Sequence, residues 1–198
     1  MINHLVGLFA HPLEEWETIR QEHETLGRAF IHVGSLAAIP AICAFLGTTT
    51  SGWRIGTGEP IRLTTESALS MAVLYYLVLL AAVYSVGWMI HWMSETYGAK
   101  QPLSQCVVLA AYVATPLFLV GFLGVYPSLW LNLVVGLPAL AYSVFLLYTG
   151  VPVMMDVPPE RGFLFSSAIL AVGLVGLVGI LAFTVVLWGI GIGPVYTS

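Results

Sequence analysis

The chain has 198 residues, of which 59% are hydrophobic and only 8% are charged, and its formal net charge is −4. A soluble domain carries roughly 25% charged residues, so this composition excludes a soluble domain and predicts an integral membrane protein. Six basic residues provide no basic patch, which excludes nucleic acid as a partner.

Residues 1–28 are predicted to form a cytoplasmic amphipathic segment. The beginning, MINHLVGLFAHPLEEWE, lacks the basic and apolar regions of a cleaved signal peptide. Apolar side chains recur at three- and four-residue intervals, which predicts one helix with an apolar stripe of Leu13, Trp16, Ile19, His23, Leu26 and Phe30. The polar face is acidic, which favours packing on the helical bundle or on a partner protein over binding to an anionic lipid surface.

Five later stretches are long and apolar enough to cross a bilayer, which takes about 20 residues. They are expected at residues 29–47, 67–93, 105–125, 128–150 and 163–192. The predicted fold class is therefore an all-α membrane protein, with a five-span membrane domain over residues 29–198 behind the amphipathic segment. Only Tyr-Pro-Ser separates the third span from the fourth, so these two should form an antiparallel hairpin.

Basic residues in short loops predict the orientation of the spans. With the N-terminus in the cytoplasm, four basic residues lie inside and two outside; they are Arg20, Arg28, Lys100 and Arg161, against Arg54 and Arg62. An odd number of spans then places the C-terminus in the periplasm.

Few ionisable side chains fall within the predicted spans. His32 lies near the inner end of the first span, and His91 lies one helical turn from Glu95 at the inner end of the second. A histidine and a carboxylate at this spacing can bind a metal or relay a proton. No further ligand is placed to complete a tetrahedral set, and the alternative is interface residues that are solvated or paired with Lys100 or Arg28. We therefore assign no metal and no cofactor.

Prolines interrupt three of the predicted spans, at Pro40, Pro116 and Pro138. Each removes a helix hydrogen bond and leaves a carbonyl that needs another partner in lipid. Tyr112 and Thr115 are candidate local partners beside Pro116. The three breaks either shape helix packing or frame a solute path, as discontinuous helices do in many transporters.

A glycine repeat, GLVGLVG, occurs in the fifth span. It places Gly173, Gly176 and Gly179 within one third of the helix circumference. Small residues on one face predict the close approach of a neighbouring helix in the membrane.

The third span contains YVATPLFL and the fourth closes with LLYTGVP, while GLFAHP, AAIPAICAFLGTT and YPSLWL occur elsewhere along the chain. Together with five spans behind an amphipathic start, these segments resemble the Yip-domain family, whose name comes from members that interact with Ypt/Rab GTPases. The resemblance covers most of the chain and implies a bacterial inner-membrane location and no catalytic residues. Its eukaryotic members imply membrane trafficking, bilayer shaping and small-GTPase recruitment through a long N-terminal segment, whereas only residues 1–28 precede the first span here.

The predicted function is a non-enzymatic inner-membrane protein that acts by helix packing, by forming a homo-oligomer or by binding another membrane protein. No HExxH, GxSxG, P-loop or GxGxxG motif is present. The alternative is a transporter or channel for a small solute or metal ion, with Tyr112, Pro116, Asn132 and Pro138 near its path.

Overall fold

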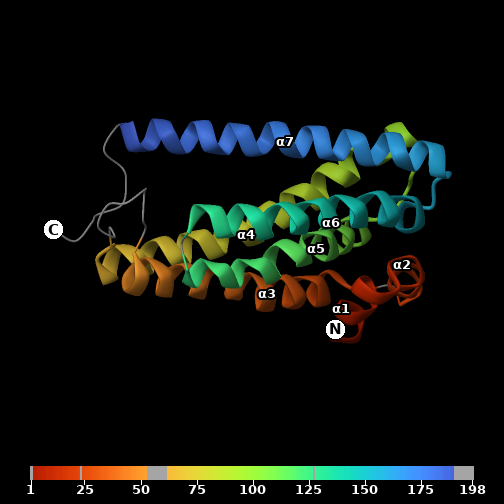
Figure 1. Cartoon of the computed structure of the whole chain (residues 1–198). Coiled ribbons are helices and arrows are strands. Elements are labelled where there is room, and N and C mark those ends of the chain that lie inside the picture. The colour runs from red at the N-terminus through yellow and green to blue at the C-terminus, as the bar shows by residue number, and fades with distance from the viewer. Residues whose placement is uncertain (1, 23, 53–61, 127, 190–198) are drawn as a thin grey trace.

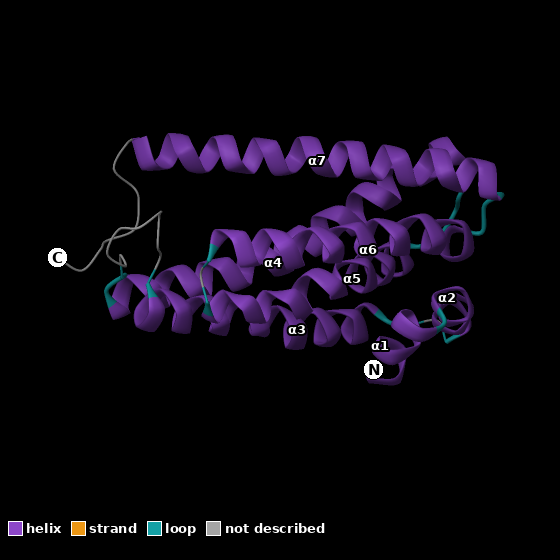
Figure 2. Cartoon of the chain, in the orientation of Figure 1, coloured by secondary structure: helices purple, strands orange, loops and turns teal. Residues whose placement is uncertain are grey.

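A computed structural model of the chain describes residues 2–22, 24–52, 62–126 and 128–189, and the elements within these ranges are helices without strands (Figure 2). In chain order they are α1 (Ile2–Ala10), α2 (Pro12–Gln21), α3 (Leu26–Leu46), η1 (Gly47–Ser51), α4 (Thr65–Ser94), η2 (Glu95–Tyr97), α5 (Leu103–Val120), η3 (Gly121–Val125), α6 (Leu129–Met155) and α7 (Pro159–Gly189).

Five of these helices, α3 to α7, are long and apolar enough to cross a membrane, which confirms the predicted all-α five-span fold. Their ends differ from the sequence-based boundaries. The largest difference is in α6, which continues through Pro152 to Met155, where Asp156 ends it in the left-handed conformation with φ of 53°. The described part of α7 ends at Gly189. This residue lies at the opposite end of the bundle from α1 and α2 (Figure 1), as an odd number of spans requires.

Helix α5 lies at the centre of the bundle, and α4 and α7 lie at its periphery. In the most apolar stretch of α5, 56% of the residues are buried, compared with 6% in each of α4 and α7. The α5 residues from Cys106 to Tyr112 are all buried and pack against the inner faces of α3, α4 and α6. The outer faces of α4 and α7 expose large apolar side chains, as expected of lipid-facing helices.

Close helix contacts depend on glycines in the middle of the chain. A Cβ added to Gly87 of α4 would lie 2.7 Å from Val107 Cα of α5, and one added to Gly121 would lie 2.9 Å from Pro40 Cα of α3. A Cβ added to Gly124 would lie 3.1 Å from Ala44 N, also in α3. These contacts are with backbone atoms, so a larger residue would push the helices apart.

The glycine repeat of α7 has a different environment. A Cβ added to Gly173, Gly176 or Gly179 would meet no atom within 4 Å among the described residues. The close neighbour that the repeat predicts is therefore not another described helix of this chain.

The N-terminal segment differs from the single amphipathic helix predicted from the sequence. The apolar stripe is divided, because α2 ends at Gln21 and Leu26 begins α3, whose first turn is capped by the Thr25 side chain. Leu13 and Phe30 are 59% and 41% exposed, and His23 lies outside the described residues. Trp16 and Ile19 are buried, so the prediction that the segment packs on the bundle is confirmed for α2.

Candidate functional site

A buried polar region surrounds Tyr112, in the middle of α5. The Tyr112 side chain is fully buried, and its hydroxyl donates a hydrogen bond of 3.0 Å to Glu24 Oε1. Glu24 lies in the connection between α2 and α3. The hydroxyl therefore joins the central helix to the N-terminal segment instead of bonding to the α5 backbone near Pro116.

Three further rings contact Tyr112 from three helices. His32 of α3 lies with its ring centroid 4.4 Å from that of Tyr112. Trp16 of α2 and His4 of α1 make edge contacts at 6.4 and 6.1 Å. Tyr112 is therefore the point at which α1, α2 and α3 meet α5.

His4 is 8% exposed and lies between two carboxylates. Its Nδ1 is 2.5 Å from Glu15 Oε1, and its Nε2 is 3.4 Å from Glu22 Oε2. One potential ligand atom from each of His4, Glu22 and Glu24 lies within 4.8 Å of the other two. We refer to His4, Glu15, Glu22, Glu24, His32 and Tyr112 as the Tyr112 cluster.

His32 is buried, which corrects the expectation that it is solvated or paired with Lys100 or Arg28. It is 1% exposed, and its Nε2 lies 3.0 Å from Thr115 Oγ1. The Thr115 hydroxyl itself donates to the Ala111 carbonyl, one turn back in α5. His32 Nδ1 is buried and has no hydrogen-bond partner among the described residues, so this imidazole is incompletely satisfied.

Helix α6 fixes α1 and α2 over the cluster. Trp16 Nε1 donates to Thr149 Oγ1 at 3.3 Å, and a Cβ on Gly150 would lie 2.7 Å from the indole ring. Arg20 of α2 forms a 3.0 Å ion pair with Asp156 at the end of α6. The contacts in the middle and at the C-terminal end of α2 hold it across the end of the bundle.

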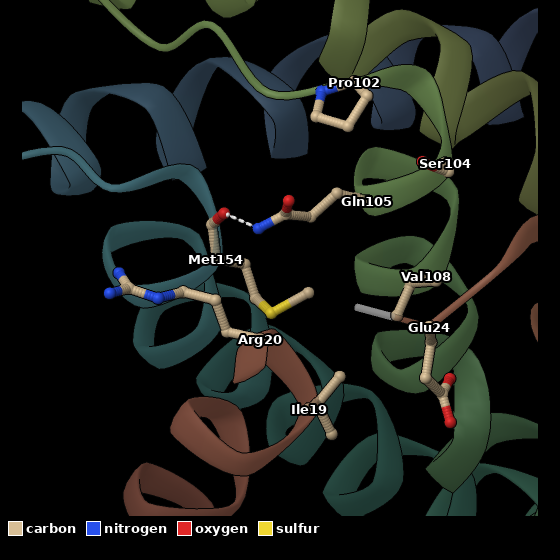
Figure 3. A pocket seen from close by; sticks show the side chains of 8 residues that line it. All are labelled: Ile19, Arg20, Glu24, Pro102, Ser104, Gln105, Val108 and Met154. Atoms are coloured by element: carbon tan, nitrogen blue, oxygen red, sulfur yellow. Dashed lines mark hydrogen bonds between the residues drawn. The ribbon is translucent and has the colours of Figure 1, made fainter. Parts of the chain in front are cut away.

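A small cavity lies beside the cluster, between α2, α5 and α6 (Figure 3). Its volume is about 90 Å³, and its polar lining residues are Arg20, Glu24, Ser104 and Gln105. Gln105 Nε2 donates to the Met154 carbonyl at 2.5 Å. In Figure 3 the Glu24 carboxylate points away from Gln105, so its charge lies on the far side of the cavity from the Gln105 amide.

The other candidate residues from the sequence lie apart from the cluster. Pro40 and Pro116 are buried, whereas Pro138 is exposed on α6. Asn132 Nδ2 donates to the Ser128 carbonyl at 2.8 Å, a local contact at the start of α6. His91 and Glu95 are both exposed.

Sequence comparison gives the family of the chain. The model of the Yip1 domain matches residues 6–194, from α1 to beyond the described part of α7. The chain belongs to the Yip1 domain family. The matched range contains all five predicted spans and every member of the Tyr112 cluster except His4, which lies just before it.

Two relatives of this Yip1 protein share its length. They are the inner membrane protein YohC of Escherichia coli strain K12 and that of E. coli O6:H1 strain CFT073; each is 46% identical over 191 residues, which cover 96% of this chain and 98% of the relative. No solved structure matches the chain significantly. The relatives and the five apolar helices support a multi-pass protein of the inner membrane.

Sequence reasoning identified Tyr112 and His32 but missed their partners. His4, Glu15, Glu22 and Glu24 fall in a segment whose charges were interpreted as the solvated face of one helix. The break between α2 and α3 turns Glu24 inward to Tyr112. The signal for this break in the sequence is Thr25, because threonine is a favourable N-cap residue and marks the start of a new helix at Leu26.

Proposed function

We propose that this Yip1 protein has no catalytic role and acts by associating with a second copy of itself or with another membrane protein through α7. The names of the family and of the relatives describe a domain and an inner-membrane protein rather than a reaction. The central helix α5 is used for internal packing, which leaves the peripheral helices available for partners.

The open glycine face of α7 carries this proposal. Gly173, Gly176 and Gly179 leave the backbone accessible on a helix whose neighbours contact it elsewhere. Helices associate in lipid by van der Waals packing and by close backbone approach, since lipid already surrounds apolar side chains as well as another helix does. A glycine face therefore favours a partner helix over lipid chains.

Substitution at the centre of this face tests the proposal. Gly176→Leu should reduce self-association, measured by energy transfer between labelled copies in liposomes, or remove a membrane protein that co-purifies with the wild type. Val175→Leu, at a 73% exposed position of the same helix, should leave association unchanged. If Gly176→Leu has the same association and the same co-purifying proteins as the wild type, α7 is not the partner surface.

We further propose that α1 and α2 lie on the cytoplasmic side. The four basic residues of this end, Arg20, Arg28, Lys100 and Arg161, outnumber the described basic residue of the other end, Arg62. Reporter fusions after residue 100 should report a cytoplasmic site, and fusions after residue 198 a periplasmic one. A cytoplasmic signal at both positions would contradict this orientation.

Transport of a small solute or metal ion is the second candidate function. The cavity beside Glu24 favours it, because about 90 Å³ accommodates several water molecules. Its lining does not include Tyr112, Pro116, Asn132 or Pro138, which the transport prediction placed along a path. Measurement of solute and metal-ion flux into proteoliposomes distinguishes transport from association.

A further inference from the structure

We propose that His4, Glu22 and Glu24 bind one divalent transition-metal ion, such as Zn²⁺, and that the ion fastens the N-terminal segment to the membrane bundle. The proposal goes beyond the association function and does not depend on it. It rests on the orientation of each ligand, on buried polar atoms without partners, and on the spacing of the donor atoms.

Glu15 orients His4 for metal binding. The short contact from His4 Nδ1 to Glu15 Oε1, 2.5 Å, requires a proton on Nδ1, because a carboxylate oxygen only accepts. In the neutral imidazole, Nε2 then presents a lone pair to Glu22 Oε2 at 3.4 Å. The space between these two atoms is filled either by a second proton on Nε2 or by a metal ion, and only the metal ion also uses Glu24. A carboxylate behind a ligating histidine is the usual outer-shell arrangement of such sites.

Tyr112 orients Glu24 in the same way. Its hydroxyl donates a hydrogen bond to Glu24 Oε1, while Glu24 Oε2 is buried without a hydrogen-bond partner among the described residues. A buried carboxylate oxygen without a partner is costly. Oε2 is the atom that a bound ion would satisfy.

His32 gives an independent indication that the region lacks a polar partner. It is almost fully buried, its ring centroid lies 4.4 Å from that of Tyr112, and its Nδ1 has no hydrogen bond among the described residues. A water molecule bound to the ion, in the position that three protein ligands leave open, is a suitable partner for this nitrogen.

The donor spacing favours a small transition-metal ion. Bonds of about 2.0 to 2.1 Å in a tetrahedral zinc site place neighbouring donor atoms about 3.3 Å apart, close to the 3.4 Å between His4 Nε2 and Glu22 Oε2. The Glu24 ligand atom lies within 4.8 Å of the other two, so a change of its side-chain torsions completes the set. One imidazole and two carboxylates suit zinc, iron or manganese better than calcium, which takes six to eight oxygen ligands.

The charge of the cluster also favours a divalent cation. Glu15, Glu22 and Glu24 place three carboxylates around one imidazole, and Arg20 is engaged with Asp156. The ligands come from α1 and from the connection between α2 and α3, and Tyr112 links them to α5. An ion bound there connects three segments that are separate in the sequence.

Zinc titration of the purified protein in detergent, after treatment with a chelator, tests the site. Isothermal titration calorimetry should show one Zn²⁺ per chain for the wild type. Glu22→Gln and Glu24→Gln should each weaken binding at least about 10-fold, and Tyr112→Phe, which removes an outer-shell donor, about 10-fold. Ca²⁺ and Mg²⁺ should not compete.

Two control variants separate this site from other histidines and carboxylates. Glu17→Gln, on the exposed face of α2, and His91→Ala, at the exposed end of α4, should bind zinc as the wild type does. Helical circular dichroism checks folding; if Glu24→Gln does not fold, Glu22→Gln decides, since the Glu22 side chain is 42% exposed. Absence of stoichiometric binding, or unchanged affinity in the glutamine variant that folds, overturns the proposal.

Discussion

Trp16→Ala should lower the free energy of unfolding by about 3 to 5 kcal/mol, the range for removing a large aromatic side chain from a core. Trp16 is fully buried against Gly150 and Tyr112, and its indole nitrogen donates to Thr149. The alanine variant loses the buried area, the hydrogen bond and the shape that Gly150 accommodates. Titration with a denaturing detergent, followed by circular dichroism, measures the loss.

Leu13→Ala is the matched control on the same helix. Leu13 is 59% exposed, so its truncation should change stability by less than about 0.5 kcal/mol. Limited proteolysis gives a second measurement, since the N-terminal segment of Trp16→Ala should be cleaved faster than that of the wild type. Equal losses in the two variants would show that α2 is not held on the bundle by Trp16.

Gly87→Ala should destabilise the protein by about 1 to 3 kcal/mol, as overpacking does in a dense interior, and Gly87→Leu should destabilise it more. The new Cβ would lie 2.7 Å from Val107 Cα, and a backbone atom cannot move without moving α5. Alanine has a helix propensity about 1 kcal/mol more favourable than that of glycine. We expect the steric cost of the new Cβ to exceed this gain, because the contact is with the backbone of α5. Unfolding in the same detergent titration reports the difference.

Gly136 of α6 provides the comparison for Gly87. A Cβ at Gly136 meets no described atom within 4 Å, so Gly136→Ala should keep the gain in propensity without a steric cost. Its stability should match or exceed that of the wild type. If both alanine variants are stabilised, α4 and α5 are not in close backbone contact at Gly87.

The spans were predictable because the bilayer imposes one strong requirement on sequence, a stretch of about 20 apolar residues. Their ends were less predictable. The prediction placed Pro152 in a loop, but α6 continues through it to Met155. The Met154 carbonyl is one of the last of the helix, where no N–H of the next turn reaches it, and it accepts a hydrogen bond from Gln105 of α5. Such compensation comes from another helix and is therefore invisible in a local window.

The glycines and carboxylates show a second limit of sequence reasoning. The regular repeat at Gly173 to Gly179 predicts a close helix contact, whereas the isolated Gly87 and Gly121 make close contacts within the chain. Glu24 was counted with a polar helix face, yet it accepts a hydrogen bond from buried Tyr112. Periodicity identifies a face of a helix, but the partner of that face depends on the tertiary arrangement.

The link between Trp16 and Thr149 spans 133 residues of sequence, which sets an order of events during biosynthesis. At roughly 5 to 20 residues per second, the ribosome needs roughly 7 to 27 s after making Trp16 to complete its docking site on α6. For most of this interval α2 has left the ribosome while its docking site on α6 is still missing. The newborn chain therefore depends on the insertion machinery or the membrane surface to shelter its first helices until the fourth span arrives.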